Sequence, residues 1–180
     1  MRTLVIAAAC IALATGCVRA GSRPISTIPA VKGKPKIVFA LRQIDMRVGT
    51  GAEVRPRSCV YAHYTGWLTN GTKFDSSRDT MPNGRPREPI SFPQSYRRVI
   101  AGWDIGFDGM RVGGQRRLFI PYQLAYGAAG RAPVIPAKAE LIFDVELMAV
   151  ADTLPRAEPT PRGQAAPPPA CPAWKDVSGR

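Results

Sequence analysis

Short stretches of alternating apolar and polar residues recur through the middle of the chain, each bounded by glycine, proline or asparagine. A period of two is typical of half-buried β-strands. Asn70-Gly71, between two such stretches, predicts a tight hairpin turn. The pattern predicts strands over 37–44, 58–68, 72–74, 89–92, 115–120 and 140–150.

One segment, SYRRVIAGW at 95–103, predicts a helix instead. Ser95 is a candidate N-cap, and Val99, Ile100 and Trp103 recur at helical spacing. Many antiparallel strands with one short helix indicate an α+β fold. We expect an antiparallel, curved sheet of five to six strands that wraps around the helix.

The composition divides the 180 residues into four parts. Of the 18 prolines, ten lie in residues 1–36 and 152–180, whereas most of the 17 glycines lie between these ends. Residues 1–20 resemble a signal peptide, and 21–36 form a basic, proline-rich linker. A single domain is expected over 37–151. Residues 152–180 are rich in proline and alanine, and we expect this tail to be disordered.

The signal-like segment has one arginine, then an apolar run too short to span a bilayer, then small residues. Its Ala14-Thr15-Gly16-Cys17 ending resembles a bacterial lipobox, in which Cys17 is acylated after cleavage. Cleavage after Ala20, and an uncut signal that acts as an anchor, are the alternatives. We therefore predict export to the periplasm or cell envelope, with Cys17 as the candidate lipid attachment site.

The net charge of +12 is unevenly placed, with six Lys/Arg and no acid in residues 1–36. A basic arm of this kind suits a tether beside an anionic membrane. No helix or ribbon interleaves basic with aromatic residues, so nucleic-acid binding is not expected.

The four cysteines give no disulfide framework and no metal-ligand cluster. Cys59 opens a predicted strand and is most simply a small core residue. A disulfide between Cys59 and Cys171 is an alternative that the spacing does not require.

The stretch after the predicted hairpin turn raises the question of catalysis, because Asp75 lies beside Ser76 and Ser77. A Ser76–His63–Asp75 triad is an alternative on paper, but no nucleophile elbow surrounds Ser76. Metal clusters and phosphate-binding loops are also absent from the sequence, so no cofactor is expected. Aromatic and apolar residues near an acid and phenol hydroxyls instead describe a mostly apolar pocket.

Three long stretches carry a family resemblance: VYAHYTGWLTNGTKFDSSRD, VIAGWDIGFDGMRVGGQRRLFIPYQLAYG and PVIPAKAELIFDVELMAV. They resemble the FKBP family of peptidyl-prolyl cis-trans isomerases through nearly all of 53–150. The resemblance implies Xaa-Pro bonds of protein chains as substrates, a role in folding exported proteins, and macrolide immunosuppressants as ligands. A non-catalytic module or chaperone that binds proline segments is the main alternative, and a hydrolase is a weaker one.

The resemblance also assigns the site. The catalytic residues it implies are Tyr64, Asp75 and Tyr126. The substrate-binding residues are Phe74, Phe92, Val99, Ile100, Trp103, Ile135 and Phe143. Such a pocket binds the twisted amide better than the planar one, without nucleophile or metal. Asp75 then has two candidate roles, contacting the carbonyl carbon or holding Tyr64 by a hydrogen bond.

The loop over 80–88 (TMPNGRPRE) departs from the small family members by being longer and more basic, and we expect it to border the pocket. With Arg98 and Arg131, its residues Arg85 and Arg87 predict a basic rim. The hypothesis that follows is a preference for clients with acids near the proline.

Overall fold

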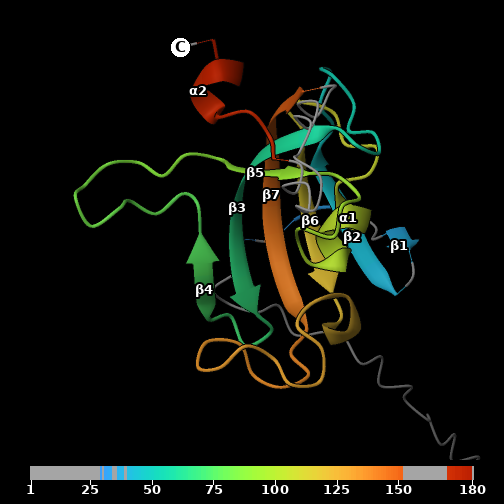
Figure 1. Ribbon diagram of the computed structural model, residues 1–180. Helices are drawn as coiled ribbons and strands as arrows, with labels where there is room; N and C mark the ends of the chain where they lie inside the picture. Colours follow the sequence, from blue (N-terminus) through green and yellow to red (C-terminus); the bar gives the residue numbers. More distant parts are fainter. Residues whose placement is uncertain (1–28, 30, 34–35, 39, 152–169, 180) are drawn as a thin grey trace, which may run out of the picture.

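The computed structural model describes residues 29, 31–33, 36–38, 40–151 and 170–179 (Figure 1). The predicted lipid attachment site, Cys17, lies outside these residues. So do the predicted signal peptide and most of the predicted linker and tail. Among those described, no helix has the length and hydropathy that crossing a bilayer requires.

The predicted strands all form, with small shifts at their ends. The strands are β1 (Lys36–Val38), β2 (Leu41–Arg47), β3 (Cys59–Leu68), β4 (Lys73–Ser76), β5 (Ile90–Pro93), β6 (Gln115–Ile120) and β7 (Leu141–Ala151). The expected first strand is divided in two, because the chain reverses at Ala40, whose φ of 64° is left-handed. The Asn70-Gly71 turn is confirmed: Gly71 has φ 88°, and its N–H donates to the Leu68 carbonyl.

All pairings in the sheet are antiparallel, in the order β1-β2-β6-β7-β3-β4, with β5 also paired to β3. The curved antiparallel sheet over a short helix is therefore confirmed, with seven strands in place of five to six. β3 and β7 pair along their full lengths, from Cys59 opposite Ala151 to Leu68 opposite Leu141. This long central pair gives the site its rigid back wall.

The helix α1 spans Ala101–Gly106, so the prediction of a helix from 95 was wrong. Ser95 and Arg97 have φ values of 66° and 54°, which a right-handed helix excludes. Ser95 is not the N-cap; its backbone N–H donates to the carboxylate of Asp104, at 2.9 Å. Asp104 itself lies in the first turn of α1.

Two glycines let α1 lie directly against β6. A Cβ at Gly102 would come 2.3 Å from Ile120 Cγ2, and one at Gly106 would come 2.6 Å from Leu118 Cδ1. Because neither position has a side chain, the helix approaches the sheet closely and Trp103 is buried between them, with 5% of its surface exposed. This contact fixes the residue around which the pocket is built.

The end of the described chain differs from the expectation of a disordered tail. Residues 174–177 form a short helix, α2 (Trp174–Val177), at one end of the β3–β7 pair (Figure 1). Cys171 is disulfide-bonded to Cys59, and Pro172 accepts a hydrogen bond from the Tyr61 hydroxyl at 2.8 Å. Trp174 packs on the ring of Tyr61, with centroids 5.8 Å apart. Cys59 is thus buried, as expected, but in the disulfide that had been the less favoured alternative.

Candidate functional site

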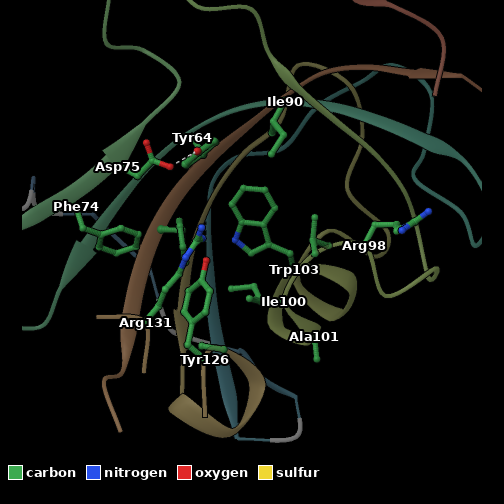
Figure 2. A pocket seen from close by; sticks show the side chains of 13 residues that line it. Tyr64, Phe74, Asp75, Ile90, Arg98, Ile100, Ala101, Trp103, Tyr126 and Arg131 are labelled. Atoms are coloured by element: carbon green, nitrogen blue, oxygen red, sulfur yellow. Dashed lines mark hydrogen bonds between the residues drawn. The ribbon is translucent and has the colours of Figure 1, made fainter. Parts of the chain in front are cut away.

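A cavity of about 630 Å³ opens between the sheet and α1 (Figure 2). This volume lies in the range of small-ligand sites. Of the ten predicted catalytic and substrate-binding residues, eight line it. They are Tyr64, Phe74, Asp75, Val99, Ile100, Trp103, Tyr126 and Phe143.

Trp103 occupies the centre of this pocket. Its ring packs edge-on against Tyr64 and Phe143, with centroids 5.0 and 5.3 Å away. Its indole N–H is buried and has no hydrogen-bond partner among the described residues. The pocket therefore has a fixed aromatic floor with one unused donor.

Two predicted residues lie outside the cavity lining. Phe92 is buried beside Trp103, with ring centroids 5.7 Å apart, so it supports the floor from the core. Ile135 lines a second cavity of about 390 Å³ that shares Phe74, Asp75, Tyr126 and Arg131 with the pocket. Because these four residues line both, the two cavities adjoin each other.

The polar centre of the site is the pair of Tyr64 and Asp75, on neighbouring strands β3 and β4. The Tyr64 hydroxyl donates to Oδ2 of Asp75 at 2.5 Å (Figure 2). The Ser76 backbone N–H donates to Oδ1 at 2.9 Å. Burial, followed by this bond to the carboxylate, raises the pKa of Tyr64 far above its ordinary value. Tyr64 therefore stays protonated and donates to Asp75 throughout the physiological pH range.

The alternative triad does not form. His63 Nδ1 lies 3.0 Å from the hydroxyl of Ser77 and not beside Ser76, which bonds Thr65 instead, at 2.9 Å. Asp75 is engaged by Tyr64 on the opposite side of the strand from His63. A hydrolase based on these residues has no geometric support.

His63 lies among polar and charged side chains outside the pocket lining. Burial lowers its pKa, and the Arg78 guanidinium lowers it further, against smaller opposing effects of Glu146 and Ser77. Arg78 also forms an ion pair with Glu146. His63 thus belongs to a polar cluster on the sheet surface, away from the pocket lining.

Sequence reasoning assigned no role to Ile90, Ala101 or Ala125, and it placed Arg98 and Arg131 on the rim without naming them as substrate-binding residues. All five line the pocket. The two alanines carry no chemical signal of their own in a sequence. Arg98 and Arg131 were visible in the sequence only as members of the predicted basic rim.

The prediction that the basic loop borders the pocket holds for Arg87 but not for Arg85. Between Thr80 and Pro86, which form an isolated bridge, the chain extends away from the sheet (Figure 1). Arg85 does not line the pocket, and its backbone N–H donates to Oδ1 of Asn83 at 3.1 Å. Only Arg87 returns to the site, where its guanidinium lies 3.5 Å from Asp75 Oδ1.

The described residues contain no group of three or more His, Cys, Asp or Glu side chains that could hold a metal ion. The chemistry of this site is that of an aromatic cavity with hydroxyl, carboxylate and guanidinium groups at its edge.

Comparison with known proteins gives consistent matches over the same region. Residues 51–148 match the family model described as FKBP-type peptidyl-prolyl cis-trans isomerase. The chain is 48% identical over 106 residues to an FK506-binding protein of Neisseria meningitidis serogroup A, covering 59% of this chain and 92% of that protein. It is also 48% identical over 104 residues to an FKBP-type peptidyl-prolyl cis-trans isomerase FkpA of Aeromonas hydrophila, covering 58% of this chain and 35% of that one.

Solved structures show the same similarity. A peptidyl-prolyl cis-trans isomerase of Pseudomonas syringae pv. tomato superposes with a TM-score of 0.57 at 30% identity, covering 67% of this chain and 84% of that chain. FkpA from Escherichia coli gives a TM-score of 0.56 at 36% identity, covering 65% and 51%.

Proposed function

The chain belongs to the FKBP-type peptidyl-prolyl cis-trans isomerase family, and from this premise we propose that the cavity around Trp103 is where it accelerates rotation about Xaa-Pro bonds. The isomerase activity is that of the family. The observation that carries the assignment of the site is the aromatic cavity with the Tyr64–Asp75 pair at its edge.

The reaction explains why this site needs no nucleophile. Rotation about an amide is resisted by about 18–20 kcal/mol, because the C–N bond has partial double-bond character. In the twisted transition state that resonance is lost, so the carbonyl is less polar than in the planar amide. A cavity walled by Phe74, Trp103 and Phe143 therefore penalises the planar amide more than the twisted one. Preferential binding of the transition state lowers the barrier.

Asp75 acts, in this proposal, by positioning Tyr64. Both of its carboxylate oxygens already accept hydrogen bonds, one from Tyr64 and one from the Ser76 backbone. A carboxylate held in this way is poorly placed to approach a substrate carbonyl carbon. The geometry therefore favours the second of the two roles predicted from the sequence.

Tyr126 and Trp103 supply the donors for the substrate. The Tyr126 hydroxyl is directed into the pocket opposite Trp103 (Figure 2). The unpartnered indole N–H of Trp103 is a second donor, available to an acceptor that enters the floor. We propose that the prolyl ring rests on Trp103 while Tyr126 holds the neighbouring backbone. Macrolides of the FK506 type, after which the Neisseria relative is named, are proposed to occupy the same cavity.

The test is isomerisation of a neutral Leu-Pro peptide, followed by NMR exchange, with the wild type and Asp75→Ala. Asp79→Ala is the matched control, because Asp79 lies four residues away in an exposed ion pair with Lys73. We expect Asp75→Ala to lower kcat/KM about tenfold and Asp79→Ala to leave it within twofold. Equal rates for Asp75→Ala and the wild type would show that catalysis does not use this pair.

We also propose that the protein acts outside the cytosol, in the periplasm or cell envelope. The support within the described residues is the Cys59–Cys171 disulfide, since such bonds persist mainly in oxidising compartments. The test is mass spectrometry of the protein isolated from an envelope fraction. An N-terminus at a diacylglyceryl-modified Cys17 would establish the lipid anchor, and one at Gly21 would establish ordinary cleavage. Recovery of the uncleaved, reduced chain from the cytosol would contradict export.

A further inference from the structure

Arginines dominate the charge at the mouth of the site. Asp75 is the one acid among the described residues that line the pocket, whereas Arg98 and Arg131 both line it. Arg87 is paired with Asp75. Neither Arg98 nor Arg131 has an acidic partner among the described residues. The mouth therefore carries unpaired positive charge, and its one carboxylate is already engaged.

Arg131 and Arg98 differ in where they point. Figure 2 shows Arg131 directed into the pocket, with its guanidinium near the Tyr126 hydroxyl, whereas Arg98 is directed away from the pocket beyond α1. The Arg131 guanidinium lies 5.9 Å from the centroid of the Tyr126 ring. Of the arginines predicted to form a basic rim, only Arg131 thus presents an unpaired charge to a bound chain.

The backbone holds Arg131 in place. The N–H of Arg131 donates to the Ile135 carbonyl at 2.8 Å, and the Ile135 N–H donates back to the Arg131 carbonyl at 2.9 Å. Gly130, with φ 70°, precedes it, and a Cβ there would lie 2.3 Å from the Pro136 carbonyl oxygen. The turn is therefore closed tightly at its base, and the guanidinium projects from a fixed point between the two cavities.

We propose that Arg131 is a specificity-determining residue that selects client segments with a carboxylate side chain directly before or directly after the proline. This inference rests on the proposed function, because it concerns which proline segments the same site accepts. A chain bound across the two cavities must pass Arg131, which lines both. A client carboxylate at that point gains an ion pair, while a client lysine meets like charge and finds Asp75 already occupied.

The exposure of Arg131 sets the expected size of the preference for acidic clients. Arg131 is exposed, so its pair with a client acid is worth about what surface ion pairs are worth, which is about two- to fivefold in affinity. Since a lysine is also repelled, we expect kcat/KM for a Glu peptide to exceed that for a Lys peptide about three- to tenfold at low salt. Screening should bring this ratio close to one at about 1 M salt.

The experiment measures NMR exchange on peptides without charged ends, in which Glu, Gln or Lys stands directly before or directly after the proline. A neutral Leu-Pro peptide is measured in parallel. The proteins are the wild type, Arg131→Gln, Arg131→Lys and Arg55→Gln. Arg55 is an exposed arginine outside the pocket lining, so Arg55→Gln removes the same net charge from elsewhere.

The proposal expects the Glu:Lys ratio of the wild type to be retained in Arg131→Lys and Arg55→Gln and to fall to near one in Arg131→Gln. A ratio near one in the wild type in both peptide series would overturn it, as would a ratio that Arg131→Gln leaves unchanged. The neutral peptide distinguishes a failure of the Arg131 proposal from a failure of the proposed function. Acceleration of that peptide without a Glu:Lys difference refutes only the role of Arg131, whereas no acceleration of any peptide refutes the proposed function.

Discussion

Breaking the Cys59–Cys171 disulfide should destabilise the domain without altering its catalytic site. The bond joins the start of β3 to a segment 112 residues later in the sequence. Closing a loop of about 100 residues removes up to about 4.7 kcal/mol of chain entropy from the unfolded state, and measured values are typically about 2–4 kcal/mol. We therefore expect Cys171→Ser to lower the free energy of unfolding by about 2–4 kcal/mol.

Equilibrium unfolding in urea is the appropriate assay, with the wild type measured in the presence and absence of reductant. The reduced wild type should unfold at the same urea concentration as Cys171→Ser. Trp174→Ala is the control for the packing of α2, because it removes the contact with Tyr61 and leaves the disulfide intact. It should cost only about 1 kcal/mol, which is the scale of an aromatic pair.

Catalysis provides the second readout. The disulfide lies at the Cys59 end of β3, whereas Tyr64 is the residue of that strand that lines the pocket. The folded Cys171→Ser protein should therefore keep kcat/KM within about twofold of the wild type. If Cys171→Ser unfolded at the same urea concentration as the oxidised wild type, the reasoning would be refuted. That result would mean that the bond does not constrain the chain in solution.

Three further predictions concern the strand β3. Tyr64→Phe removes the donor to Asp75 and should lower kcat/KM about three- to tenfold, while it costs about 1 kcal/mol of stability. Unchanged kinetics in a folded variant would count against a role of the Tyr64–Asp75 pair in catalysis. Gly66→Ala would place a Cβ 2.6 Å from Phe74 Cζ, so we expect a loss of about 1–3 kcal/mol in urea and a fall in kcat/KM larger than for Tyr64→Phe. The pKa of His63 is lowered in the folded state, so the unfolded chain binds more protons as the pH falls through about 6.5, and stability should decrease there. His63→Gln should remove part of this decrease between pH 7.5 and 5.5, and an identical pH dependence in that variant would show that other groups cause it.

Sequence alone predicted the elements whose signals are local. The strand predicted over 115–120 matches β6 to the residue, and alternation identified β7 to within one residue at each end. The Asn70-Gly71 turn follows from the freedom of glycine to adopt positive φ. The aromatic residues of the pocket were found because they lie in long stretches that resemble one family.

The errors arose where distant contacts decide the structure. Helical spacing at 95–100 was overridden by the left-handed residues Ser95 and Arg97 and by the bond from Ser95 to Asp104. The disulfide joins residues on either side of almost the whole domain, so no local pattern could indicate it. The direction of Arg131 into the pocket, in contrast to Arg98, likewise depends on turn geometry that composition does not reveal.

The central claim is that the cavity built on Trp103 performs the isomerisation. The most direct test is NMR exchange on a neutral Leu-Pro peptide with the wild type and Trp103→Ala, with circular dichroism to confirm that both are folded. Uncatalysed exchange takes tens to hundreds of seconds, and we expect the wild type at micromolar concentration to shorten it to about a second or less. A loss of at least about tenfold in kcat/KM for folded Trp103→Ala is the predicted result. Wild-type rates in that variant would contradict the account, because they would locate catalysis outside this pocket.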